Sequence, residues 1–411
     1  MKENLFNSLV EGMENYIMFT IKARQLELSE GLKAKNRAPI MLSMGAPIEP
    51  VPTFVKEKTA KYLLQDPLHT YSTPKGELRF LEAVSARMKK RFDVELNPKA
   101  EVFSLIGSKE GLSNMIRALV NPKDKKEDQD VILTPNPGYA SYSQMIKLCG
   151  ANCYGIDLTE ENNYMPDLYE VLEKYINEGN DPNKIKALII NYPNNPLGCT
   201  CDLKYLQHCV DFCNKLGILL ISDNAYCEMY YDEQSKPHSA LECEGAMDCC
   251  VEFHSLSKTY AMTGWRLGWA CGNKKAITML SRVKSTIDTG IFKVLQYAAA
   301  DLIESAEGDK YIEEQNIKFE KKIRTFVEGL NKLGYKVKMP TTTFYLWVEI
   351  PERFENSKAF ADAMLEKSGI VIVPGTGFSP NGQRHVRMSV VASDNDLAEV
   401  LKRMKEDGFE F

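Results

Sequence analysis

Short apolar runs alternate with amphipathic stretches from about residue 100 onward, and this pattern constrains the fold more than any other feature of the chain. The apolar runs lie at 102–107, 130–139, 185–196, 218–226 and 249–258. Between the first two runs, apolar residues from Leu112 to Leu119 recur at helical spacing, and another helix is expected to end at Gly217. Strands rich in Val, Ile and Leu that alternate with helices indicate an α/β domain with a mostly parallel sheet.

The C-terminal part of the chain has a different pattern. A long helical region at 293–334 is followed by further apolar runs with a helix between them. We expect strands at 335–340, 342–350, 370–375 and 385–391. The sequence therefore predicts three parts. Residues 1–49 form an N-terminal arm and part of a small domain, 50–295 form a large domain, and 296–411 form a small C-terminal α+β domain.

Charge and composition narrow the classes of partner. The 411 residues carry a formal net charge of -5 at pH 7, which argues against a nucleic-acid binder with a basic face. No run approaches the roughly 20 apolar residues that a membrane span needs, and the first residues lack the apolar core of a signal peptide. The eleven cysteines do not form the paired C-x-x-C pattern of a zinc site. We expect a cytoplasmic protein with reduced cysteines, no bound metal, and neither nucleic acid nor membrane as a partner.

The stretch SLSKTYAMTGWRLGW (255–269) places a lysine among two hydroxyls and an arginine, directly after an apolar run. In open parallel sheets, ligands bind in the loops at the carboxyl ends of the strands. The plain interpretation is a strand end with one solvated lysine. In the chemical interpretation, Ser255, Ser257 and Arg266 hold a phosphate, together with Ser108 at the start of an expected helix. Lys258 would then carry a cofactor attached to its amine.

Other strand ends supply groups suited to an aromatic ring. Asp223 ends the apolar run at 218–223, Tyr226 follows it, and Asn195 lies in the turn NYPNNP. Alone, each could be a loop cap or a turn residue. Together with the phosphate site they describe pyridoxal 5'-phosphate, in which Asp223 pairs with the ring nitrogen and Lys258 condenses with the aldehyde. Tyr226 and Asn195 would bond to the ring oxygen, and Tyr139 would stack on the ring.

The whole set of motifs resembles a known enzyme family from about residue 40 to residue 411. The ordered motifs are Tyr71, Gly107-Ser108-Lys109, Tyr139, Asn195, Asp223-x-x-Tyr226, Ser255-x-Ser257-Lys258, Arg266 and Arg387. This order is similar to that of the class I/II aminotransferases of fold type I, and the segments IGSKEG, NYPNNPLG and STIDTGIF are most similar to LL-diaminopimelate aminotransferases. Two departures bear on the substrate rather than the cofactor. Ala46 follows Gly45 where the family typically has an acidic residue, and SDNAY carries Asn224.

The resemblance implies transfer of an amino group between an amino acid and a 2-oxo acid with pyridoxal phosphate as cofactor. LL-diaminopimelate with 2-oxoglutarate is one pair, and aspartate or alanine are the alternative donors. Lys258 would move the proton, with Asp223 and Tyr226 assisting, and Lys109 would join the cofactor site. Arg387 would grip the substrate α-carboxylate near Gly45 and Asn195, although most arginines at the start of a strand face solvent.

The resemblance also implies a homodimer with shared sites. Tyr71 would reach the cofactor phosphate of the opposite subunit, whereas its plain interpretation is a tyrosine on a surface loop. Ser285, Asp288 and Thr289 are candidates for reaching the distal end of the substrate. Two other functions stay open. A pyridoxal-phosphate β-lyase would share the fold and the lysine, and a cofactor-binding regulatory module would need an attached DNA-binding domain.

Overall fold

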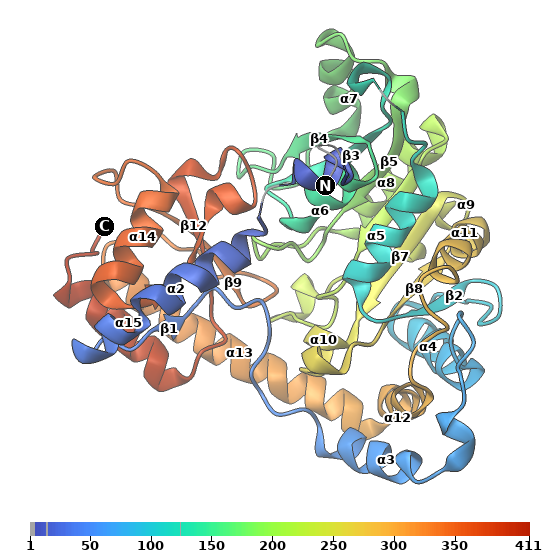
Figure 1. The fold of residues 1–411 in the computed structure, drawn as a ribbon, viewed down its shortest axis with the longest axis horizontal. Helices are drawn as coiled ribbons and strands as arrows, with labels where there is room; N and C mark the ends of the chain where they lie inside the picture. The colour runs from blue at the N-terminus through green and yellow to red at the C-terminus, as the bar shows by residue number, and fades with distance from the viewer. Residues whose placement is uncertain (1–4, 14, 124) are drawn as a thin grey trace.

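A computed structural model of the chain describes residues 5–13, 15–123 and 125–411, and Figure 1 shows its ribbon. The centre is a seven-stranded sheet in the order β2-β8-β7-β6-β5-β3-β4. Its strands are β2 (Val102–Leu105), β3 (Val131–Asn136), β4 (Asn152–Asp157), β5 (Ile185–Ile190), β6 (Leu219–Asp223), β7 (Cys250–Ser255) and β8 (Gly268–Gly272). Strands β3 to β7 pair in parallel, and β8 pairs antiparallel with β7 and β2. The expected mostly parallel sheet is confirmed.

Helices cover both faces of this sheet because neighbouring residues of each buried strand point to opposite sides. In β6, Ile221 packs on one face and Leu220 on the other. One face is covered by α5 (Ser108–Leu119), α6 (Ser141–Leu148) and α11 (Lys274–Lys284). The other face carries α4 (Leu78–Phe92), α7 (Leu168–Asn177), α8 (Leu203–Leu216), α9 (Ala246–Cys249) and α12 (Lys293–Glu304), the last of which also packs on α3 (Thr53–Leu63). Helix α8 ends at Gly217, as predicted, in the left-handed conformation with φ of 66°.

A second body is built around the three-stranded sheet β11-β12-β9. It contains β9 (Tyr345–Glu349), α14 (Ser357–Ser368), β11 (Val373–Pro374), β12 (His385–Ser389) and α15 (Asp394–Glu406). The long helix α13 (Ala306–Lys332) runs between this body and the large sheet (Figure 1). The second body has a hydrophobic core of its own, separate from the cores on the two faces of the large sheet.

The N-terminal segment belongs in space to this second body. Strand β1 (Ile40–Met41) pairs in parallel with β10 (Ile370–Val371), and α2 (Ile17–Ala34) packs on α14 (Figure 1). Only the short helix α1 (Ser8–Glu11) lies elsewhere, against α6. The parallel β1–β10 pair therefore joins two segments that are far apart in sequence.

One expected strand of the C-terminal part is absent. Residues 335–340 are alternately buried, but they form no strand. The reason is that the Asn331 side chain takes the place of a strand partner: its Oδ1 accepts from Val337 N at 2.9 Å and its Nδ2 donates to Val337 O at 3.1 Å. Arg387 is the third residue of β12 and is 3% exposed, which excludes its plain interpretation as a solvent-facing arginine at a strand start.

Most of the cysteines contribute to the hydrophobic cores. All eleven cysteines are free, and eight of them are buried. Across the ranges that the structure describes, no helix combines the length and apolar character needed to cross a membrane. The buried thiols act as small apolar side chains within the sheet cores, as expected.

Candidate active site

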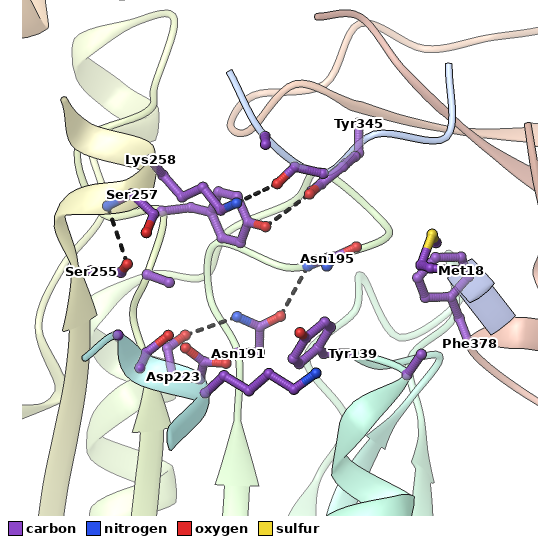
Figure 2. A pocket seen from close by; sticks show the side chains of 18 of the residues that line it. Met18, Tyr139, Asn191, Asn195, Asp223, Ser255, Ser257, Lys258, Tyr345 and Phe378 are labelled. Carbon is purple, nitrogen blue, oxygen red and sulfur yellow. Dashed lines mark hydrogen bonds between the residues drawn. The ribbon is translucent and has the colours of Figure 1, made fainter. Parts of the chain in front are cut away.

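A cavity of about 320 Å³ opens where the carboxyl ends of the sheet strands meet the second body (Figure 2). Most of the sequence-predicted site residues line it. They are Gly45, Ser108, Lys109, Tyr139, Asn195, Asp223, Tyr226, Ser255, Ser257, Lys258, Arg266 and Arg387. These residues come from seven different segments of the chain and converge on one cavity. The sequence showed only that several of them stand at strand ends.

One corner of the cavity is built to hold an anion. Ser255 caps the short helix α10 (Leu256–Thr259), and its Oγ accepts from Ser257 N at 3.2 Å. Arg266 Nη1 donates to the Thr263 carbonyl at 2.8 Å and lies 3.5 Å from Ser257 Oγ. Gly107 precedes α5 with φ of 123°, and a Cβ there would come within 2.7 Å of Arg266 Nη2. Free N–H groups at the start of α5, hydroxyls and a guanidinium form a suitable phosphate cradle.

Lys258 lies between this corner and the second body. Its ammonium donates to the carbonyl of Gly45 and stands 5.8 Å from the centre of the Tyr226 ring. Burial lowers the pKa of Lys258 to about 8, with the charges of Arg387 and Arg266 acting in the same direction. At pH 7 about a tenth of such an amine is neutral, against well under a thousandth for an ordinary lysine. The lysine is therefore suited to act as a nucleophile and a base.

Asp223 faces the cavity from the end of β6. Its Oδ2 accepts from the Tyr142 hydroxyl at 2.6 Å, and its backbone carbonyl accepts from Asn191 Nδ2 at 2.8 Å (Figure 2). Its Oδ1 is buried and has no hydrogen-bond partner among the described residues. Burial raises the pKa of Asp223 to about 6, and the hydrogen bond from Tyr142 opposes that rise. An unpartnered carboxylate oxygen in a cavity calls for a donor from a ligand.

Arg387 forms the opposite end of the cavity. Its guanidinium lies between the rings of Tyr345 and Phe378, 4.3 and 4.7 Å from their centres. Nη1 donates to Asn195 Oδ1 at 2.9 Å and Nη2 to the Ser43 carbonyl at 2.8 Å, while Nε has no partner. Within the described chain, no carboxylate lies within ion-pair distance of Arg387. A buried guanidinium with neutral neighbours is a binding site for a carboxylate.

Gly45 and Tyr345 close the wall between these two ends. Tyr345 Oη lies 2.9 Å from Tyr226 Oη (Figure 2). A Cβ on residue 45 would come within 2.8 Å of Tyr345 Oη, so any larger residue here would force the Tyr345 hydroxyl to shift. This wall therefore combines Tyr226 from the loop after β6, Tyr345 from β9 and Gly45 from the loop after β1.

Sequence reasoning missed several lining residues, among them Tyr16, Met18, Asn191, Tyr345 and Phe378. Asn191 begins the NYPNNP turn and accepts from Asn195 N at 2.9 Å, so the repeated asparagines of that turn could have indicated it. Tyr16 lies under the Lys109 ammonium, which is 4.6 Å from its ring centre and 5.9 Å from that of Tyr139. No local signal marks Tyr16, Met18 or Phe378, because the second body brings them to the cavity.

Other predicted residues do not line this cavity. Tyr71 is 85% exposed, and its proposed approach to the site of another subunit stays a prediction. Asp288 accepts from Lys284 Nζ at 2.7 Å and from Gly290 N at 2.9 Å. Ser285 donates to the Arg282 carbonyl at 2.9 Å. The role of the 285–289 stretch at the distal end of the substrate also stays a prediction.

Comparisons with known proteins agree with this geometry. Residues 38–404 match the family model described as aminotransferase class I and II. The chain is 37% identical over 365 residues to an LL-diaminopimelate aminotransferase of Nitratidesulfovibrio vulgaris, covering 89% of this chain and 90% of that protein. It is 36% identical over 409 residues to LL-diaminopimelate aminotransferase 2 of Nostoc sp., covering 99% of both.

Solved structures share the fold. The substrate-bound structure of BacF from Bacillus subtilis is 32% identical with a TM-score of 0.90, and the match covers 98% of this chain and 97% of that one. An aspartate aminotransferase of Thermus thermophilus is 24% identical with a TM-score of 0.87, covering 98% and 99% of the two chains, and it supports the fold alone. The chain therefore belongs to the class I and II aminotransferases. It is an aminotransferase of fold type I, from a family that uses pyridoxal phosphate, and its curated relatives include LL-diaminopimelate aminotransferases.

Proposed function

We propose that this aminotransferase binds pyridoxal 5'-phosphate in the described cavity and takes LL-diaminopimelate and 2-oxoglutarate as its amino donor and acceptor. The observation that carries the cofactor assignment is the set of complementary groups around one cavity. These groups are an anion cradle, a lysine with a lowered pKa, and a buried carboxylate with one free oxygen. Their chemistry matches a phosphate, an aldehyde and a protonated ring nitrogen.

The proposed cofactor would be held by residues of the large sheet. Ser108, Ser255, Ser257 and Arg266 would bind the phosphate, with Lys109 beside it, and Tyr139 would pack on the ring. Asn195 and Tyr226 would bond to the ring oxygen, and the free Oδ1 of Asp223 would accept from the ring nitrogen. When bound, pyridoxal phosphate supplies an electron sink for the pair of electrons left when the substrate Cα loses its proton.

The protein's own groups would move and hold the proton. Lys258 is the base, because its lowered pKa leaves neutral amine available, and it returns the proton once its ammonium has formed. Asp223 is in a position to hold a proton on a neighbouring nitrogen, since the burial that raises its pKa also strengthens its attraction for a cationic partner. The Tyr226 hydroxyl is held by the Tyr345 hydroxyl, 2.9 Å away, and would bond to the ring oxygen of the cofactor from that position.

Arg387 would bind the α-carboxylate common to every amino acid and 2-oxo acid. A bidentate guanidinium fixes the plane of that carboxylate and so fixes which bond of Cα faces Lys258. Gly45, Asn195 and Tyr226 line the cavity between Lys258 and the Tyr345–Phe378 pair that holds Arg387. This arrangement suits proton removal at Cα.

The substrate pair rests on the names of the relatives. Aspartate and alanine are the alternative donors, and a β-lyase activity is a less favoured alternative. Of the two sequence departures, Ala46 lines the cavity, whereas Asn224 donates to the His238 carbonyl at 3.1 Å within the protein. Ala46 is therefore the departure that bears on the substrate.

A panel of amino donors tests the proposal. The purified enzyme is loaded with pyridoxal phosphate and offered LL-diaminopimelate, aspartate or alanine with 2-oxoglutarate, and glutamate formation is measured. Fastest turnover with LL-diaminopimelate is expected. A faster donor would replace the proposed substrate. Release of ammonia and pyruvate, without glutamate, from an amino acid that carries a leaving group on Cβ, such as cysteine, would identify a β-lyase. Failure to bind pyridoxal phosphate at all would overturn the cofactor assignment.

The proposal has two further parts. The chain divides into three parts, with boundaries at residues 49/50 and 295/296. The protein is a cytoplasmic homodimer whose two subunits share their active sites. Tyr71 and Phe292 are both exposed in the single chain, and the Phe292 ring lies 6.3 Å from that of His69, two residues before Tyr71. Exposed large side chains of this kind support burial against a second copy. Mixing Lys258→Ala chains with Tyr71→Ala chains gives heterodimers in which one site keeps both residues. We expect activity approaching half the parental value per heterodimer. No recovery, with heterodimers shown independently, would contradict shared sites.

A further inference from the structure

Tyr142 is a buried residue that none of the roles above uses. It lies on α6, is 2% exposed, and its hydroxyl donates to Asp223 Oδ2 at 2.6 Å. This short hydrogen bond to a carboxylate is of the stronger, charge-assisted kind. No other hydrogen bond of the Tyr142 hydroxyl exists among the described residues.

Packing holds the Tyr142 ring in one place. The ring belongs to the core between the large sheet and α5, α6 and α11. The Tyr139 ring meets it edge to face, with centres 5.5 Å apart and planes at 86°. A phenol confined in this way has few alternative rotamers, so its hydroxyl is pre-organised toward Asp223.

The contacts of Asp223 leave one direction open. Tyr142 occupies Oδ2, Asn191 Nδ2 binds the backbone carbonyl, and Oδ1 alone has no partner. Free rotation of the carboxylate would exchange its two oxygens, but the hydrogen bond from Tyr142 opposes that rotation. The backbone N–H of Ala225 also favours the ionised form of Asp223. The charges of His254 on β7 and Lys258 on α10 act in the same direction, yet no direct hydrogen bond from either to this carboxylate is found among the described residues.

We propose that Tyr142 is a positioning residue, which holds the Asp223 carboxylate ionised with Oδ1 directed into the cavity toward the nitrogen of a bound heteroaromatic ring. This inference rests on the proposed cofactor. Because the hydrogen bond involves a charged acceptor, its loss should weaken the hold of Asp223 on a cationic partner by roughly 10- to 100-fold. Tyr142 itself does not touch the reacting atoms.

The test uses Tyr142→Phe, which keeps the ring and removes the hydroxyl. Parent and variant are loaded with pyridoxal phosphate carrying ¹⁵N in the ring, and the ¹⁵N chemical shift is followed against pH. We expect the ring nitrogen of the variant to lose its proton at a lower pH than that of the parent, and kcat to fall about tenfold with KM unchanged. Tyr154→Phe is the matched control, since Tyr154 also donates to a carboxylate, Glu178 at 3.0 Å, away from the cavity.

A double-variant cycle separates positioning from packing. If Tyr142 acts through Asp223, adding Tyr142→Phe to Asp223→Ala should cost almost nothing further in kcat. Full additivity, or an unchanged ¹⁵N titration in Tyr142→Phe, would overturn the proposal and leave Tyr142 a packing residue. A parent enzyme that binds no pyridoxal phosphate would instead refute the proposed function, so the two failures are distinguishable.

Discussion

The two ends of the cavity are built in different ways. The end at the large sheet takes its polar groups from the carboxyl ends of strands and the loops that follow them, as in Asp223 at the end of β6 and Ser255 at the end of β7. The opposite end places Arg387 between Tyr345 and Phe378, with Gly45 and Ser43 from the segment after β1 beside it. The first end therefore depends on local chain geometry. The second depends on how distant segments pack together.

Charge is also distributed differently at the two ends. At the sheet end an acid and an amine, Asp223 and Lys258, shift each other toward their charged forms and partly offset their burial. Arg387 has no such partner among the described residues, so a bound anion would neutralise its charge. We conclude that the sheet end is suited to retain a resident group, whereas the Arg387 end is suited to bind and release anions in each reaction.

The largest expected effect comes from removing the amine of the sheet end. Lys258→Ala should lower kcat by at least about 10³-fold, because both the nucleophile and the base are lost. It should also bind pyridoxal phosphate weakly and lack the visible absorbance of the attached cofactor. Stopped-flow assays and absorbance spectra measure both quantities. Lys358→Ala, an exposed lysine paired with Asp362 on α14, is the control. Parental turnover in Lys258→Ala would show that another group carries the chemistry.

Removing the acid of the same end should give the next largest effect. Asp223→Ala should reduce kcat by roughly 10²- to 10³-fold while the phosphate cradle still retains the cofactor, because an unprotonated ring is a poorer electron sink. Turnover and cofactor content are measured on the same sample, with the exposed Asp157→Ala as control. Good occupancy together with parental turnover would mean that a different residue holds the proton on the ring.

A change at the opposite end should act on binding. Arg387→Lys should raise KM about 10- to 100-fold for every amino and 2-oxo acid, because lysine cannot bind the α-carboxylate in a bidentate manner. Arg384→Lys, three residues earlier and bonded only to the carbonyls of Phe354 and Ile350, is the matched control. If the rise were confined to one substrate, Arg387 would belong to the side-chain pocket instead.

The smallest expected effect couples the two ends. The charge of Arg387 lowers the pKa of Lys258, so Arg387→Met should raise that pKa. In the unloaded protein, reaction of the Lys258 amine with an amine-selective reagent should increase with pH, with a midpoint near 8. The midpoint should move to higher pH in Arg387→Met. An unchanged midpoint would show that the two ends are electrostatically independent.

The sheet end was largely predictable, because its residues are close in sequence to recognisable strand ends. Lys258, Asp223 and Asn195 each stand beside an apolar run whose length and composition indicated a strand. The Arg387 end was predictable only in part. Tyr16 and Phe378 reach the cavity through packing of the second body, and no periodicity in their own segments encodes that contact.

The wrong strand at 335–340 has a related cause. Its alternating burial is real, with Tyr335 and Val337 buried, but alternation describes only which side chains are covered. Whether such a segment pairs with a strand depends on what meets its backbone, and here it is the amide of Asn331. Pairing of β1 with β10 was likewise outside the reach of local patterns, because its two-residue strands are too short to show a period.

The β1–β10 pair has a consequence for the order in which the chain is made. On the ribosome, residues 40–41 emerge about 330 residues before their partners at 370–371, on the order of 15–70 s earlier at ordinary translation rates. During that interval the loop that presents the carbonyls of Ser43 and Gly45 has no sheet to attach to, while the large sheet can already fold. The carboxylate-binding end of the cavity is therefore assembled last, and a nascent chain that ends before β12 has its amine and acid in place but lacks Arg387.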